Sequence, residues 1–405
     1  MDYIHAKEKL AQKGQEHLLK YYDELDEAEK RQLLDDIEGI DFSALSAGAD
    51  EKNSGKIEPL EACTSDQINE NKEKYGEIGL DAIRAGKVAC VLLAGGQGTR
   101  LGADGPKGAY NIGITKELYI FECLMNHLKA VTKKAGCAVP FAIMTSEKND
   151  LATRSFFEEH EYFGYDRRYI DFFVQEMVPS TDYDGKIYLE SKSRISRSPN
   201  GNGGWYKSLA AAGLADKYKK SGVEWINVFA VDNVLQRMAD PIFIGATISS
   251  GCEVGSKVIA KAAPDEKVGV MCLRDGRPSI VEYYELTDEM ANDRDEKGQL
   301  RYNWGVILNY LLNVNALERT AGKKMPCHMV EKKIPYIDEN GGYISPKTPN
   351  GYKYETLILD MISMMDGCLP FEVIREKEFA PVKNLHGVDS VDSARALLEK
   401  NNVAL

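Results

Sequence analysis

The sequence lacks the marks of several protein classes. Its eight cysteines form no Cys-x-x-Cys pair and its six histidines are scattered, so neither a disulfide framework nor a zinc site is indicated. The 51 lysines and arginines are outnumbered by 63 aspartates and glutamates, which gives a net charge of -12. A general nucleic-acid binder needs a broad basic surface instead. The sequence therefore predicts reduced, mostly buried thiols, and phosphate chemistry confined to a local cluster of cations.

Long apolar runs are also missing. No segment is long and apolar enough to cross a bilayer, and the acidic, amphipathic N-terminus lacks the basic-then-apolar order of a signal peptide. We therefore expect a cytoplasmic protein without membrane or nucleic-acid partners. With 43% apolar and 28% charged residues, the 405-residue chain can bury a sizeable core.

Hydrophobic patterning divides the chain into three parts. Residues 1–84 place apolar side chains at helical spacing and predict an N-terminal helical arm, in which residues 43–65 read as a surface connector. Residues 85–385 alternate short apolar runs with helical stretches, as a catalytic α/β domain does. Residues 386–405 end the chain in a short amphipathic helix.

The apolar runs of the middle part predict strands of a parallel sheet covered on both faces. Ligands of such sheets bind at the carboxyl ends of the strands. Asp275 and Gly276, between two later strand-like runs, predict an antiparallel hairpin at the sheet edge. The predicted strands are 88–96, 141–146, 170–175, 225–233 and 257–263.

The stretch "VLLAGGQGTRLGADGPKG" carries the strongest functional signal. Gly95, Gly96 and Gly98 follow a predicted strand and can expose bare N–H groups to an anion. Arg100 and Lys107 add two cations to the same stretch. The pattern is neither a P-loop, which needs Lys followed by Ser or Thr, nor a GxGxxG dinucleotide fingerprint. It predicts a loop that binds a nucleotide or a phosphate.

This loop and later segments resemble the family of nucleotidyltransferases that make nucleotide sugars, specifically the eukaryotic-type UDP-N-acetylglucosamine and UDP-sugar pyrophosphorylases. The resemblance is collinear and spans nearly the whole chain. It implies an α/β fold with a Rossmann-like mixed sheet of the nucleotide-diphospho-sugar transferase (GT-A-like) type. The matching segments are "FFVQEMVP", "GNGGWYKSL", "VDNVLQRMADPIFIG", "KVGVMCLRDGRPSIVEYYEL", "EKKIPYID", "PNGYKYE" and "EFAPVKN".

The reaction implied by the resemblance joins UTP to a sugar 1-phosphate, foremost N-acetylglucosamine 1-phosphate, and gives UDP-sugar and pyrophosphate. Such a transfer needs in-line positioning and charge neutralisation more than a side-chain nucleophile. The matched motifs imply that Mg²⁺, with Mn²⁺ as a substitute, is held by Asp232 at a strand end. The catalytic cations that they imply are Arg100, Lys107, Lys353 and Lys383.

The resemblance also implies how the two substrates are recognised. Amides supply both a donor and an acceptor, which a uracil edge requires. The implied nucleotide-binding residues are Leu93, Ala94, Gly95, Gly96, Gln175, Gly201 and Asn202. The implied sugar-binding residues are Asn202, Gly269, Glu282 and Asn303.

Two departures from the family pattern leave the sugar open. Trp304 stands where the N-acetylhexosamine enzymes have a small residue, and Leu357 and Leu359 replace aromatics. Glucose or galactose 1-phosphate is therefore an alternative substrate. The chain also ends soon after "PVKN", so we expect most of the family's C-terminal domain to be absent and the protein to be a monomer.

Other classes of function remain open as well. A non-catalytic nucleotide-sugar-binding module would keep the glycines of the loop and lose its charged partners, which are present here. A transferase that uses a UDP-sugar donor would need a DxD motif at a strand end, and the "DYD" string at 182–184 lies in a loop flanked by Gly and Lys. A nucleotidyltransferase for another base, such as thymidine, is a third alternative.

Overall fold

The computed structural model describes residues 1–42, 45 and 55–405. Contacts divide the chain into two compact units. Unit 1 comprises Met1–Ser54, Glu176–Gly204 and Lys324–Ile358, and unit 2 comprises Gly55–Gln175, Trp205–Lys323 and Leu359–Leu405. This division by contacts is not linear along the chain, and the boundaries 1–84, 85–385 and 386–405 stay a prediction.

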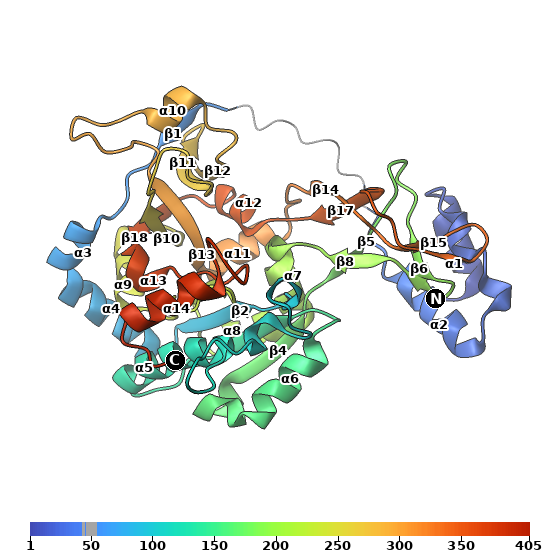
Figure 1. Ribbon diagram of the computed structural model, residues 1–405, viewed down its shortest axis with the longest axis horizontal. Coiled ribbons are helices and arrows are strands. Elements are labelled where there is room, and N and C mark those ends of the chain that lie inside the picture. The colour runs from blue at the N-terminus through green and yellow to red at the C-terminus, as the bar shows by residue number, and fades with distance from the viewer. Residues whose placement is uncertain (43–44, 46–54) are drawn as a thin grey trace. The chain divides into compact units, whose positions relative to one another are not determined.

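Unit 2 is built on a mixed ten-stranded sheet, whose strands are traced in Figure 1. Four of its strands run parallel in the order β9-β2-β3-β4. Each begins at or within two residues of its predicted run and is apolar along most of its length. Their bounds are β2 (Val88–Leu93), β3 (Phe141–Thr145), β4 (Ile170–Val174) and β9 (Trp225–Ala230).

The remaining strands make the sheet mixed, as the family resemblance implied and the apolar runs alone did not. Strand β13 (Trp304–Asn313) pairs antiparallel with β9 on one side and with β10 (Val254–Ala260) on the other. Strand β18 (Cys368–Glu372) then runs parallel to β10. The predicted run 257–263 overlaps β10, but β10 does not pair with the four parallel strands, because the long β13 lies between β10 and β9.

The predicted hairpin is confirmed as β11 (Val270–Arg274) and β12 (Arg277–Val281). Asp275 and Gly276 between them have φ of 50° and 76°, the left-handed pair that a two-residue hairpin turn requires. Strand β1 (Ile57–Pro59) pairs with β11, so part of the expected connector is a strand. The connector's residues 43, 44 and 46–54 lie outside the described residues.

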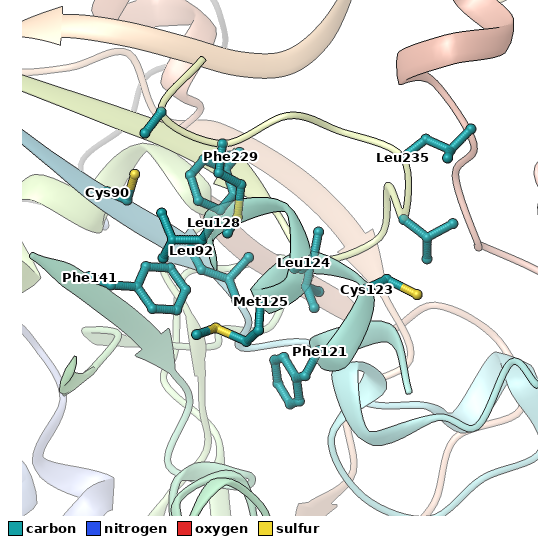
Figure 2. Close-up of a cluster of buried hydrophobic side chains, with 14 of the residues drawn as sticks. Cys90, Leu92, Phe121, Cys123, Leu124, Met125, Leu128, Phe141, Phe229 and Leu235 are labelled. Carbon is teal, nitrogen blue, oxygen red and sulfur yellow. The ribbon is translucent and has the colours of Figure 1, made fainter. Parts of the chain in front are cut away.

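Helices bury apolar faces against this sheet. Helix α5 (Ile120–Ala135) contributes Leu124 and Leu128 to the buried cluster that also contains Leu92 of β2 and Phe229 of β9 (Figure 2). Helix α4 (Lys72–Arg84) packs against α9 (Pro241–Ser250). At their crossing a Cβ on Gly79 would lie 1.9 Å from the carbonyl oxygen of Pro241, so only glycine permits this approach.

The other α-helices of unit 2 are short, with at most ten residues each. The predicted C-terminal helix is present as α14. Their bounds are α3 (Ser65–Glu70), α6 (Asp150–Glu159), α7 (Trp205–Ala211), α8 (Leu214–Lys220), α10 (Asp288–Asn292), α11 (Val314–Ala321), α12 (Ile358–Ser363), which starts at the unit boundary, α13 (Arg375–Glu378) and α14 (Val391–Lys400).

Unit 1 packs helices α1 (Tyr3–Ala11) and α2 (Glu27–Glu38) against small two-stranded ladders. Its core joins Leu10 and Leu33 of the helices to Ile195 of a strand far along the chain. The helices predicted at the N-terminus are therefore present up to Glu38. The ladders are β5 (Met177–Pro179) with β8 (Arg197–Pro199), β6 (Leu189–Ser191) with β7 (Arg194–Ile195), β14 (His328–Lys332) with β17 (Gly351–Glu355), and β15 (Tyr336–Ile337) with β16 (Tyr343–Ile344).

The structure also tests what the sequence was expected to lack. None of the eight cysteines forms a disulfide, and four of them are buried. Burial raises the pKa of Cys123 and Cys272 to about 12, which keeps these thiols protonated and unreactive. Within the described residues, no helix has both the length and the apolar character needed to cross a membrane.

Candidate active site

The glycine-rich loop leaves the sheet at the carboxyl end of β2. The Ala94 N–H donates to the Met144 carbonyl at 2.8 Å, which extends the β2–β3 ladder by one residue. Asn149 then donates from Nδ2 to the carbonyls of Ala94 (2.9 Å) and Gly96 (3.2 Å), and Ser146 Oγ donates to that of Gly95 (2.9 Å). These bonds tie the loop carbonyls to the segment that follows β3 and fix the path of the loop backbone.

Gln175 reaches the same loop from the end of β4. Its backbone N–H donates to the Thr145 carbonyl at 2.8 Å, and its side chain is buried. Its Oε1 lies 3.1 Å from the position that a Cβ on Gly95 would take. The structure therefore brings together Gln175 and the loop glycines, two parts of the implied nucleotide-binding set.

Lys107 is the most buried of the implied catalytic cations in unit 2. It begins the short helix η5 (Lys107–Ala109), and its Nζ lies 4.0 Å from Asp232 Oδ2. Burial lowers the pKa of Lys107, the cations Lys383 and Arg100 lower it further, and Asp232 opposes them. Asp232, Lys383 and Arg100 therefore all lie close enough to Lys107 to influence its charge, and all four residues come from the implied set.

The same edge of the sheet places Lys383 beside Asp232. Asp232 follows β9, and its carbonyl accepts a hydrogen bond from the Val382 N–H at 2.8 Å. Lys383 is half exposed and pairs through Nζ with Asp389 Oδ2 at 2.9 Å. A phosphate entering the site would compete with Asp389 for this cation.

Asp232 fits a metal site only in part. Its carboxylate is about a quarter exposed, and the described residues contain no cluster of three or more His, Cys, Asp or Glu side chains that could hold a metal ion. Mg²⁺ is often bound by one or two carboxylates with substrate phosphates and water completing the octahedron. The donor set therefore fits Mg²⁺ that arrives together with a nucleotide.

The implied sugar-binding residues of unit 2 lie near the start of β13 in two groups. A Cβ on Gly269 would be 3.6 Å from Glu282 Oε1, and the Gly269 carbonyl accepts from the Val306 N–H at 2.9 Å. Asn303 accepts from the Lys261 N–H through Oδ1 at 3.0 Å. Asn303 and Trp304 line a cavity of about 610 Å³ that Gly269 and Glu282 do not line.

Gly201, Asn202 and Lys353 belong to unit 1. The Asn202 Oδ1 accepts from the Ile358 N–H at 2.9 Å, and the Gly203 N–H donates to the Thr356 carbonyl at 2.9 Å. This ties the "GNGG" motif to the segment in which Leu357 departs from the family pattern. Lys353 lies on β17. The assigned roles of these residues stay predictions.

Sequence reasoning missed several residues that shape the site. Asn149 and Ser146 hold the loop carbonyls, and Asn233 and Lys257 both bond to Glu378, five residues before Lys383. Asn149 closes the "SEKN" turn after β3, where an Asn that bonds the local backbone is a recognisable signal. Asn233 directly follows Asp232 in "VDN", but nothing local to that tripeptide reveals its distant partners.

Comparisons with known proteins show which family the chain is similar to over most of its length. A family model described as UTP–glucose-1-phosphate uridylyltransferase matches residues 44–405. A Mus musculus protein named UDP-N-acetylhexosamine pyrophosphorylase-like protein 1 is 37% identical, over 93% of this chain and 79% of its own. The UDP-N-acetylglucosamine pyrophosphorylase of Saccharomyces cerevisiae is 36% identical, over 94% and 83%. The crystal structure of the Trypanosoma brucei UDP-N-acetylglucosamine pyrophosphorylase in complex with an inhibitor matches with a TM-score of 0.81 at 29% identity, over 96% and 83%.

Proposed function

Because the chain belongs to the UTP–glucose-1-phosphate uridylyltransferase family, we propose that it makes UDP-N-acetylglucosamine and pyrophosphate from UTP and N-acetylglucosamine 1-phosphate. The chain is a nucleotidyltransferase of this family, and uridylyl transfer from UTP to a sugar 1-phosphate is the family's reaction. The choice of sugar is supported by the names of the yeast and trypanosome relatives.

The observation that carries the proposal is the gathering of Arg100, Lys383 and Asp232 around Lys107 at the carboxyl edge of the sheet. Pyrophosphate departs with developing negative charge, which fixed cations in a partly buried site stabilise. Lys107, held in a mostly buried position, would face that charge. Arg100 and Lys383 are more exposed and would bind the phosphates at the solvent-accessible side of the site.

The nucleotide base would lie at the ends of β2 and β4. Gly96 leaves open space there, since a Cβ on it would meet no atom within 4 Å. Gln175 would read the uracil edge with its amide. Asp232 would hold Mg²⁺ together with the phosphates, and the metal would supply charge neutralisation at the transferred phosphoryl group.

Glucose 1-phosphate is the second candidate substrate, because the matching family model carries the glucose name and Trp304 replaces a small residue at the start of β13. A Trp side chain there would occupy space that an acetamide group needs. We further propose that the protein acts as a cytoplasmic monomer.

The test is pyrophosphate release from UTP and Mg²⁺ with four sugar 1-phosphates: N-acetylglucosamine, N-acetylgalactosamine, glucose and galactose. Highest kcat/KM with N-acetylglucosamine 1-phosphate would support the proposal. Highest kcat/KM with glucose 1-phosphate would replace the sugar and keep the reaction. Absence of release with all four would reject the uridylyltransferase activity and favour a non-catalytic binding protein.

A further inference from the structure

We propose that Asn233 is a positioning residue that fixes Asp232 relative to Lys383, and that a buried ion cluster centred on Lys257 holds the other end of this connection. The inference rests on the proposed uridylyl transfer, in which Asp232 and Lys383 both act on the phosphates. Asn233 itself would touch no substrate.

The side-chain amide of Asn233 links two distant segments of unit 2. It is only 3% exposed. Its Nδ2 donates to the Glu378 carbonyl at 2.7 Å, and its Oδ1 accepts from the Ala380 N–H at 2.9 Å and the Leu235 N–H at 3.3 Å. The donor and the acceptor of one amide are therefore both used to join the chain after β9 to the end of α13 and the residues that follow it.

Backbone hydrogen bonds continue this link on both sides of Asn233. The Val382 N–H donates to the Asp232 carbonyl at 2.8 Å, and the Val234 N–H donates to the Ala380 carbonyl at 3.2 Å. Lys383 follows Val382 directly. A shift of one segment against the other would therefore move the Asp232 carboxylate away from the Lys383 ammonium.

The end of α13 is anchored by an ion cluster whose central lysine is fully buried. Lys257 on β10 is 0% exposed, and its Nζ lies 2.6 Å from Glu378 Oε2 and 3.0 Å from Asp240 Oδ2. The half-exposed Arg237 approaches Glu378 Oε1 at 3.6 Å. Buried ion pairs tolerate little displacement because an unpaired charge in the interior is strongly unfavourable. Glu378 is thus fixed at both its carboxylate and its carbonyl.

Asn227 offers a matched control within the same unit. It is 0% exposed, donates from Nδ2 to Asn309 Oδ1 (2.8 Å) and the Tyr310 carbonyl (2.9 Å), and accepts from the Ala239 N–H at 2.8 Å. The two amides therefore have equal chemistry and similar burial. Asn227 joins β9 to β13 and to the chain before α9, whereas Asn233 joins the two segments that carry the phosphate-binding charges.

The experiment compares Asn233→Ala with Asn227→Ala and the wild type in pyrophosphate release, with thermal unfolding measured first and assays run where all three are folded. Both substitutions should lower the unfolding temperature. Only Asn233→Ala should lower kcat, by about 10²-fold as for a displacement near 1 Å in a catalytic site. Its KM for the sugar 1-phosphate should change little, and its half-maximal Mg²⁺ concentration should rise.

Equal losses of kcat in the two variants, or wild-type kcat in Asn233→Ala, would overturn the inference while an active wild type keeps the proposed function. An inactive wild type would overturn both. If Asn233→Ala does not fold, the pair Asn233→Asp and Asn227→Asp replaces it. In Asn233→Asp the two acceptor bonds remain and only the bond to the Glu378 carbonyl is lost, and the same selective fall of kcat is expected.

Discussion

The loop after β2 and the "GNGG" motif are both rich in glycine, yet the structure uses glycine differently in each. In the loop, a Cβ on Gly96 would meet no atom within 4 Å, and Gly96 does not have a left-handed φ. In "GNGG", a Cβ on Gly203 would lie 2.7 Å from the Leu357 nitrogen, and one on Gly204 would lie 2.3 Å from Asn200 Nδ2.

The surroundings of Gly96 and Gly203 show two different reasons for a glycine at a position. At Gly203 the space is filled by the protein's own backbone, and Asn202–Gly204 forms the 3₁₀ turn η8 that enters helix α7. At Gly96 neither packing nor backbone conformation requires glycine, which leaves room for a ligand as the remaining reason. Substitution of Gly96 should therefore affect substrate binding, and substitution of Gly203 should affect stability.

The largest effect is expected for Lys107→Met, in the glycine-rich loop after β2. Removal of a cation that faces the departing pyrophosphate should lower kcat by about 10³-fold, because no other buried cation takes its position. The urea midpoint should stay close to that of the wild type, since burial of the charge is itself unfavourable. Lys87→Met, which removes an exposed lysine paired with Glu224, is the control and should leave both quantities unchanged. Full activity of Lys107→Met would contradict the site.

Gly203→Ala should act on folding instead. Its added methyl group would overlap the backbone at Leu357, and overpacking of this kind destabilises by about 1–3 kcal/mol. Urea unfolding measures the loss. Gly322→Ala, at a helix end with φ of -84° and no atom within 4 Å of the new Cβ, should leave the free energy of unfolding within about 0.5 kcal/mol of the wild type. A free energy of unfolding equal to that of the wild type in Gly203→Ala would contradict the difference drawn between Gly203 and Gly96.

Gly96→Ala should give the reverse result at a smaller magnitude. The free energy of unfolding should stay within about 0.5 kcal/mol of the wild type, because the methyl group meets only open space. The KM for UTP should rise about tenfold, the cost of about 1.4 kcal/mol for a methyl group that crowds the nucleotide. Steady-state kinetics and urea unfolding on one preparation test both statements. A wild-type KM together with a lower free energy of unfolding in Gly96→Ala would show that Gly96 is needed for packing and not for a ligand.

The smallest effect concerns the pH dependence of kcat/KM, which we expect Lys107 to set at its alkaline side. The pKa of Lys107 is lowered by burial and by the neighbouring cations, and its protonated form is the one that binds phosphate. As pH rises through this lowered pKa, kcat/KM should fall at a lower pH than an ordinary lysine would give. Lys107→Arg keeps its charge to higher pH, so its alkaline limb should move upward. Identical profiles for the two enzymes would show that another group sets the limb.

Much of unit 2 is predictable because its signals are local. The apolar runs give β2, β3, β4 and β9, and Asp275-Gly276 gives the hairpin turn. The loop residues and Asp232 follow strand ends, so their meeting at one edge of the sheet also follows from parallel topology. The position of β13 between β9 and β10 cannot be predicted from any short stretch of sequence, because strand pairing depends on contacts between distant residues.

The positions that the sequence did not reveal depend on such distant contacts. Asn233 bonds to residues near position 380, and the cluster of Lys257 with Glu378 joins two separate motifs. Unit 1 combines three separate stretches of the chain, of which only the N-terminal helices show a clear period. Hydrophobic patterning could not foresee this assembly.

The assembly of unit 1 also has a consequence for how the protein is made. Helices α1 and α2 are translated well before the strands against which they bury Leu10 and Leu33, which include Ile195. The rest of unit 1 comes from Lys324–Ile358, which is translated after most of unit 2. The apolar faces of the N-terminal helices therefore lack their partner strands until the segment around Ile195 has been synthesised, and unit 1 is completed only after Lys324–Ile358 has followed.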